Sequence, residues 1–239
     1  MGHLKRLAAP RHFDVPRKAA KFVIKPSPGP HPIEGCIPLG VLLRDHIKYA
    51  ETMLEAKKIV KERKVLVDWR VVTDHKFPVG LMDIVSIPEM DEHFRILPVY
   101  RKGLSLIKIQ GDEARLKICK IIRKMHVNGG HLQITLHDGN NFRFKEVGAE
   151  VLSYKTGDSL LVSFPEKSII KHLKLSEGNY ALVIKGPEEG RHGKIVEVRR
   201  DVAYPSKPTV TLETENGKVT TLLSYVMVVG EDAPMVTLA

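Results

Sequence analysis

A glycine-rich loop late in the chain has the residue types that contact a nucleic-acid backbone. Glycine permits sharply bent conformations and lets backbone N–H groups approach phosphates closely, and basic side chains neutralise those phosphates. Besides Gly186 and Gly193, the loop contains the residues that we expect to contact RNA: Lys185, Gly190, Arg191, His192 and Lys194.

The same loop does not have the pattern of a nucleotide-binding site. A P-loop would need glycine at position 188 and Ser or Thr at position 195, where the chain has Glu188 and Ile195. The spacing of Gly186, Gly190 and Gly193 also differs from the dinucleotide-binding fingerprint. We therefore expect no nucleotide cofactor.

Candidate metal ligands and nucleophiles have no suitable partners in the sequence. His131 and His137 would lie roughly 20 Å apart along a strand, too far to bind one ion together. Cys36 and Cys119 each have no neighbouring cysteine, which favours neither a zinc site nor a disulfide, and no Gly-x-Ser-x-Gly motif occurs. The sequence therefore predicts no metal, no cofactor, no small-molecule substrate and no enzymatic activity.

The first forty residues are basic and are interrupted repeatedly by proline. Proline prevents a continuous helix and favours extended or turn conformations. We therefore expect an extended arm, over residues 1–38, that buries no apolar side chain of its own and is ordered by an acidic partner. Its predicted RNA contacts are Lys5, Arg6, Arg11, His12, Arg17, Lys18, Lys21 and Lys25.

Residues 39–62 are predicted to be helical, followed by strands at 65–72 and 82–87. Thr52 and Glu55 have the spacing of a capping box, and the apolar face of the helix is expected to contain Leu54, Ala56, Ile59 and Val60. Several lysines are expected to point away from that face. The predicted RNA contacts of this region are Arg44, Lys48, Lys57, Lys58, Lys61, Lys64 and Arg70.

The remaining sequence is predicted to be rich in β-strands. Alternating apolar residues at 131–136, followed by Asp138-Gly139, predict a hairpin. Residues 112–125 fit either a helix or a strand, and further strands are expected at 180–184, 195–198, 210–212 and 220–229. The basic residues Lys117, Lys120 and Lys124 are predicted to contact RNA.

The overall composition agrees with an RNA-binding protein. The 239 residues carry a formal net charge of +10, and 43% of them are hydrophobic, which is enough for packed domains. No apolar run approaches the roughly 20 residues that span a bilayer, and the N-terminus has no signal-peptide pattern. We expect a soluble cytoplasmic protein that does not bind membranes.

Several segments resemble one protein family. GHLKRLAAPRHF, PSPGPHP, IPLG and GHLQITLHDGNN are similar to segments of the archaeal and eukaryotic e-type S4 family of small-subunit ribosomal proteins. Residues 42–87 resemble its S4-type RNA-binding motif, and residues 177–198 resemble a KOW motif. One position departs from the family pattern, because Trp69 stands where glycine is usual. Tryptophan is strained at positive φ, so we expect a turn of different shape, with Trp69 packed against the protein rather than stacked on a base.

This resemblance implies a structural protein of the small ribosomal subunit that binds small-subunit rRNA directly and adjoins neighbouring ribosomal proteins. It implies an α+β, multi-domain fold with boundaries at 1–38 (arm), 39–95 (S4-like RNA-binding domain), 96–173 (central β-rich domain) and 174–239 (SH3-like β-barrel with the KOW motif). The compact length favours an archaeal source. The alternatives are an RNA-modifying enzyme and a transient translation or transcription factor that uses the same modules.

Overall fold

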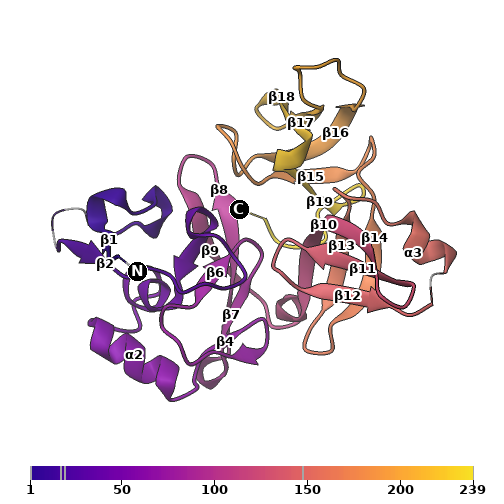
Figure 1. Ribbon diagram of the computed structural model, residues 1–239. Helices are drawn as coiled ribbons and strands as arrows, with labels where there is room; N and C mark the ends of the chain where they lie inside the picture. The colour runs from indigo at the N-terminus through magenta and orange to yellow at the C-terminus, as the bar shows by residue number, and fades with distance from the viewer. Residues whose placement is uncertain (1, 17, 19, 147, 239) are drawn as a thin grey trace. The chain divides into compact units, whose positions relative to one another are not determined.

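A computed structural model describes residues 2–16, 18, 20–146 and 148–238 (Figure 1). The chain forms two compact units. The first extends to Leu97 and resumes over Lys102–Arg115, and the second comprises Pro98–Arg101 and the chain from Leu116 onward. The protein is therefore multi-domain, and most of its regular structure is β-strand.

The first unit is built on a five-stranded sheet of order β5-β4-β7-β8-β9. Its strands are β4 (Leu66–Val67), β5 (Arg70–Val71), β7 (Ile84–Ile87), β8 (Glu92–Val99) and β9 (Gly103–Ile109). The strand predicted at 82–87 is confirmed as β7, whereas the run predicted as a strand over 65–72 is divided by a turn into the short antiparallel hairpin of β4 and β5.

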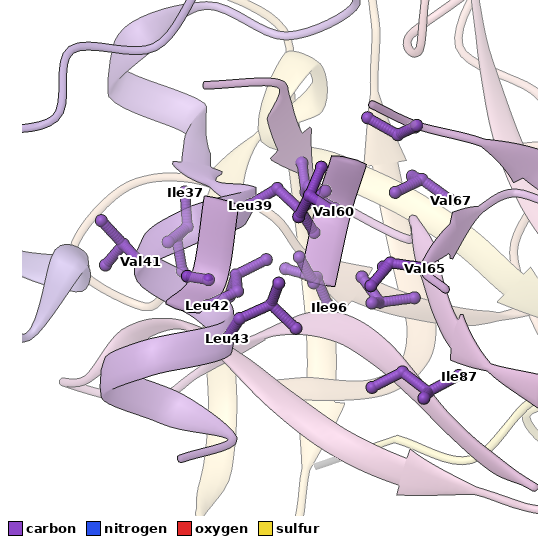
Figure 2. Packing of buried hydrophobic residues seen from close by; sticks show 14 of the residues in the cluster. Ile37, Leu39, Val41, Leu42, Leu43, Val60, Val65, Val67, Ile87 and Ile96 are labelled. Atoms are coloured by element: carbon purple, nitrogen blue, oxygen red, sulfur yellow. The ribbon is translucent and has the colours of Figure 1, made fainter. Parts of the chain in front are cut away.

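Short helices cover the apolar core of this unit. They are α1 (Leu39–Val41), a π-helical turn (Leu42–His46) and α2 (Met53–Lys61), which begins at the predicted capping box between Thr52 and Glu55. Figure 2 shows Val60 of α2 packed among residues of the core. Leu54 is 76% exposed, so its predicted place on the apolar face is wrong. Two residues before Ala56, it lies on the opposite side of the helix.

The N-terminal segment is extended as predicted, but it buries apolar side chains. It forms β1 (Leu4–Lys5), β2 (Phe22–Val23) and β3 (Cys36–Pro38), and β3 pairs with β6 (Pro78–Gly80). Phe13 is 1% exposed and belongs to the core of the first unit. The expectation of an arm without a core contact is therefore wrong.

The turn at Trp69 keeps the left-handed conformation in spite of the bulky side chain. Asp68 and Trp69 have φ values of 48° and 60°, as in the turns that favour glycine. The expected change of turn shape is wrong, whereas the expected packing is confirmed. The Trp69 indole Nε1–H donates a hydrogen bond to the Ala114 carbonyl oxygen at 2.7 Å, and its ring lies beside His93. These contacts offset the backbone strain.

The second unit contains two antiparallel five-stranded sheets. The first has the order β12-β11-β10-β13-β14 and is accompanied by α3 (Ala149–Ser153). Its strands are β10 (Leu116–Val127), β11 (His131–Leu136), β12 (Asn141–Phe144), β13 (Ser159–Ser163) and β14 (Ser168–Leu173). Residues 116–127 are thus a strand, stabilised by pairing with both β11 and β13, and the predicted hairpin at Asp138-Gly139 is confirmed.

The second sheet is curled and has the order β18-β17-β16-β15-β19. Its strands are β15 (Tyr180–Val183), β16 (His192–Arg199), β17 (Thr209–Thr214), β18 (Gly217–Leu222) and β19 (Val226–Gly230). The glycine-rich loop predicted to contact RNA joins β15 to β16. The run predicted as a strand over 220–229 is divided by a short 3-10 turn, Leu223–Tyr225.

Candidate RNA-binding surface

The exposed side of α2 carries a group of lysines that no carboxylate neutralises. Lys58 and Lys61 are exposed, Lys57 is half-buried, and none of the three forms an ion pair in the described part of the chain. The buried face of α2, with Ala56 and Val60, fixes the helix against the core. The predicted orientation of these lysines is therefore confirmed.

A loop from the same unit adds positive charge to this group. Burial lowers the pKa of His75, and the charges of Lys57, Lys76 and Lys61 lower it further, while Asp74 opposes the shift. The backbone N–H of Lys76 donates to the Asp74 carboxylate at 2.9 Å, and this bond holds the loop in a turn. Lys76 is exposed and was missed by sequence reasoning, because no local periodicity connects it to α2. Lys57, Lys58, Lys61 and Lys76 are called the lysine cluster below.

Two predicted contacts beside the lysine cluster are paired with acids. Lys64 Nζ lies 3.4 Å from both Glu62 and Glu89, and hydrogen bonding to Glu89 is the main cause of its raised pKa. The Arg44 guanidinium forms an ion pair with Asp45 at 2.8 Å. A phosphate would have to displace these carboxylates, so both residues are weaker candidates than the cluster.

The remaining predicted residues of the first unit are divided between solvent and the interior. Arg6 is 7% exposed, and His12 Nε2 lies 2.9 Å from the Cys36 carbonyl oxygen, with its pKa lowered mainly by burial. Arg17 lies outside the described residues. Lys25 is half-buried, and its Nζ donates to the Gly2 carbonyl at 3.4 Å. The others are exposed: Lys5, Arg11, Lys18, Lys21, Lys48 and Arg70.

Two basic residues of β10 lie inside the protein, which corrects their predicted role in RNA binding. Lys117 is fully buried, and its Nζ forms an ion pair with Asp138 at 3.1 Å. Burial alone would raise the pKa of Asp138, but the charges of Lys117 and His137 and hydrogen bonds from Asn140 lower it to about 2. Lys120 donates to the carbonyl oxygens of Ser224 and Val226 at 2.8 and 2.6 Å. Neither ammonium is available to a phosphate.

Lys124 also has protein partners. Its Nζ donates to the carbonyl oxygens of Val151, Leu152 and Tyr154 at 2.8 to 3.3 Å, at the C-terminal end of α3. A cation in this position satisfies carbonyl groups that the helix leaves unpaired. Its predicted contact with RNA is therefore replaced by a structural role.

The solvent face of β10, β11 and β12 presents two arginines that the predicted set did not include. Arg123 is opposite Thr135, and Arg143 is opposite Gln133, so all four side chains lie on the face away from buried Leu132 and Ile134. Arg123 and Arg143 are exposed. The alternation of β11 was the available signal, since residues on one face of a strand repeat every second position.

The glycine loop between β15 and β16 packs against protein at Gly190, which corrects its predicted contact with RNA. Gly190 is buried with φ +91°, and a Cβ there would lie less than 3.0 Å from backbone atoms of Val99 and Tyr100. The Arg191 guanidinium lies 4.5 Å from the centre of the Tyr100 ring and pairs with Glu188 at 2.7 Å. These contacts form a protein turn that has no room for a phosphate at Gly190.

The other members of the loop differ in their availability. His192 Nδ1 is hydrogen-bonded to the Tyr180 hydroxyl at 2.8 Å, which ties it to the sheet. Lys185 is exposed, and exposed Lys194 is 3.3 Å from the almost fully exposed Asp232. Two lysines therefore remain as candidate phosphate contacts.

One group of possible metal ligands occurs in the described part of the chain. Ligand atoms of Cys119, His137 and Asp138 lie within 4.8 Å of one another. The Asp138 carboxylate is already neutralised by Lys117 and accepts hydrogen bonds from Asn140 and from the Cys119 thiol. A dication here would meet a fully buried ammonium, so the group is better explained as a satisfied polar interior.

No helix within the described ranges is long and apolar enough to cross a membrane.

Comparison with known proteins identifies three matching family models in chain order. Residues 2–34 match the RS4NT domain, residues 39–85 match the S4 domain, and residues 90–169 match ribosomal family S4e. The lysine cluster lies within the S4 match, and the segment that carries Phe13 lies within the RS4NT match.

Full-length relatives agree with these matches. Small ribosomal subunit protein eS4 of Methanococcus maripaludis is 45% identical over 99% of this chain and 97% of the relative, and the Methanocaldococcus jannaschii protein of the same name has the same values. The protein of that name from Staphylothermus marinus is 41% identical over 99% of this chain and 95% of its own length. These relatives are archaeal, which fits the expected source.

A solved structure has a similar fold. The crystal structure of 30S ribosomal protein S4e from Thermoplasma acidophilum superposes with a TM-score of 0.67 at 28% sequence identity. The similarity covers 81% of this chain and 94% of that one.

Proposed function

Because this chain belongs to ribosomal family S4e and is a non-enzymatic structural protein of the small ribosomal subunit, we propose that it holds small-subunit rRNA chiefly through the lysine cluster. The observation that carries this proposal is the convergence of Lys57, Lys61 and Lys76 around His75, with exposed Lys58 next to Lys57 on α2 and no ion pair to Lys57, Lys58 or Lys61 in the described residues. Lysines that neutralise phosphates release counterions, and this release drives association.

Exposed cations elsewhere extend the proposed contact. In the N-terminal domain the proposed RNA contacts are the exposed residues Lys5, Arg11, Lys18 and Lys21. In the central sheet the proposed RNA contacts are Arg123 and Arg143, and in the curled sheet they are Lys185 and Lys194. We interpret the curled sheet as an SH3-like barrel with a KOW motif. We keep the four-module division at 38/39, 95/96 and 173/174 as part of the proposal.

Neighbouring ribosomal proteins are proposed as further partners in the cytoplasmic ribosome. Leu54 of α2 is 76% exposed and Leu152 of α3 is 57% exposed. Partners that bury such side chains gain hydrophobic stabilisation. Cross-linking within assembled subunits would identify these partners, and cross-links to RNA alone would contradict this part of the proposal.

The salt dependence of RNA binding tests the lysine cluster. We expect the Lys57→Gln, Lys58→Gln, Lys61→Gln triple variant to bind small-subunit rRNA fragments more weakly, with the log-log salt slope reduced by roughly 2 to 3, since each lost phosphate contact removes about 0.7 to 0.9. Lys64→Gln is the control, because Lys64 is paired with Glu62 and Glu89. This substitution should reduce the slope by less than the value of about 0.7 to 0.9 that corresponds to one phosphate contact. An unchanged slope in the triple variant would contradict the proposal.

Stoichiometric recovery separates a resident subunit protein from a transient factor. The wild-type protein should remain at one copy per small subunit after a high-salt wash. The triple variant should be lost at lower salt. Complete loss of the wild-type protein at moderate salt would indicate transient association.

A further inference from the structure

A small pocket in the N-terminal domain has a polar lining that shares only Arg11 with the proposed phosphate contacts. It has a volume of about 140 Å³ and is formed by the 3-10 turns Arg6–Ala8 and Arg11–Phe13 with the residues after them. Its lining includes Arg6, Pro10, Arg11, Phe13 and Asp14. All of these residues belong to the first unit.

Arg6 gives the pocket a buried hydrogen-bond donor. The residue is 7% exposed, and its Nη1 donates to the Ala20 carbonyl oxygen at 3.3 Å. Its Nε, which is also buried, has no hydrogen-bond partner in the described part of the chain. A buried donor without a partner is unfavourable, so an acceptor atom supplied by a ligand would stabilise this arrangement.

Arg11 and Asp14 place opposite charges in the lining of the same pocket. Both residues are exposed, and neither forms an ion pair within the described ranges. A free phosphate would be attracted by the arginines but repelled by the Asp14 carboxylate. The lining therefore favours a ligand that offers acceptors on one edge and donors on another.

Guanine has this combination of groups. Its O6 and N7 atoms accept hydrogen bonds from arginine. Its N1–H and N2–H₂ groups donate, and the Asp14 carboxylate is an acceptor for them. Pro10 and Phe13 add apolar surface to the lining, and the flat face of an unstacked base can contact such surface.

We propose that this pocket binds an unpaired guanine base of RNA, with Arg6 and Arg11 as donors and Asp14 as the acceptor that distinguishes guanine from adenine. The proposal rests on the proposed RNA-binding function and adds base selectivity to a surface that otherwise contacts phosphates. Adenine lacks the adjacent N1–H and N2–H₂ donors of guanine, so the Asp14 carboxylate would have no pair of donors to bind.

The test compares two hexaribonucleotides, UUUGUU and UUUAUU, binding to the full chain at one fixed salt concentration. We expect the wild-type protein to prefer the guanine-containing strand by roughly 5- to 150-fold, the range for one bidentate base contact. Asp14→Asn should abolish most of this preference. Asp14 has φ 48°, and asparagine tolerates that conformation, so the variant should keep its fold and its melting temperature. Glu34→Gln, at another exposed acid of the segment, is the matched control and should keep the preference.

Three results would overturn the proposal. They are equal wild-type affinity for the two strands, a guanine preference retained in Asp14→Asn, and displacement of UUUGUU by inorganic phosphate but not by guanosine, which would identify an anion site instead. Failure of the lysine cluster would appear differently, as an unchanged salt slope with the base preference intact.

Discussion

The imidazole Nε2 of His31 lies 3.0 Å from Oδ2 of Asp83, and both side chains are almost completely buried. The same carboxylate oxygen accepts a hydrogen bond from the Gly80 backbone N–H at 2.8 Å, and a Cβ on Gly80 would overlap the His31 ring. His31 belongs to the N-terminal domain, whereas Gly80 and Asp83 belong to the S4 domain. The pair therefore fastens two domains of the family into one packed unit.

Replacing His31 should loosen the N-terminal domain. His31→Ala leaves the buried Asp83 carboxylate without the imidazole, and the loss of one partner of a buried pair costs about 3 kcal/mol. Urea denaturation should show this decrease in the free energy of unfolding, and trypsin should cut more rapidly at Lys18 and Lys21. Glu34→Gln, at an exposed position, should behave as wild type. Wild-type protection from trypsin in His31→Ala would show that other contacts suffice.

Local patterns predicted much of the fold correctly. The capping box at Thr52 and Glu55, the alternation of Leu132, Ile134 and Leu136, and the turn at Asp138-Gly139 each depend on residues within a few positions of one another. Such signals can be read from the sequence alone, because all of the residues that form them are close together in the chain. The strand at 116–127 could not be decided locally, because it is stabilised by pairing with β11 and β13 rather than by its own periodicity.

The errors at the candidate site share a different cause. Charge patterns suggested that Lys117 and Lys120 face solvent, but their partners are distant in sequence, and Lys120 bonds to Ser224, which is 104 residues away. Phe13 lies in a proline-rich segment that shows no amphipathic pattern, yet it is buried by long-range packing. Lys76 likewise meets α2 only through the tertiary fold. Single-chain patterns contain no information on these contacts.

Gly190 should be required for folding rather than for RNA contact. Gly190→Val introduces both an unfavourable positive φ and overlap with backbone atoms of Val99 and Tyr100, which together cost about 2 to 5 kcal/mol. Gly178→Val is the matched control, because Gly178 has a similar φ of +89° but no heavy atom within 4 Å of its added Cβ. Thermal denaturation should show a larger fall in Tm for Gly190→Val. An equal fall in Tm for the two variants would mean that the overlap with Val99 and Tyr100 adds nothing to the destabilisation.

Trp69 should stabilise the protein through its hydrogen bond as well as its ring. Trp69→Phe keeps an aromatic ring but removes the Nε1–H donor, which leaves the Ala114 carbonyl oxygen without that bond, at a cost of about 1 to 2 kcal/mol. Trp69→Gly relieves the strain of φ 60°, worth roughly 1 kcal/mol, but also loses the ring contacts with His93 and Arg115. Urea denaturation should therefore rank wild type above Trp69→Phe, and Trp69→Phe above Trp69→Gly. A glycine variant as stable as wild type would contradict this interpretation.

Lys120 should make stability depend on pH in the alkaline range. Burial, and then the charge of Lys185, lower the pKa of Lys120 to about 8, from an ordinary value of 10.5. Between these two values the unfolded chain holds the proton more strongly than the folded chain does. The free energy of unfolding contributed by this residue therefore rises with pH from about 8 to 10.5, by at most roughly 3 kcal/mol.

Substitution of Lys120 isolates this contribution from other groups that titrate at alkaline pH. Lys120→Met keeps a long apolar side chain but has no proton to lose, so its stability should gain less than that of wild type when the pH is raised from 7.5 to 10.5. Urea denaturation at both pH values gives the gain for each protein. Lys174→Met removes a lysine that is exposed, and this control should retain the wild-type gain. Equal gains in wild type and Lys120→Met would show that the buried ammonium keeps its proton throughout this range, stabilised by the carbonyl oxygens of Ser224 and Val226.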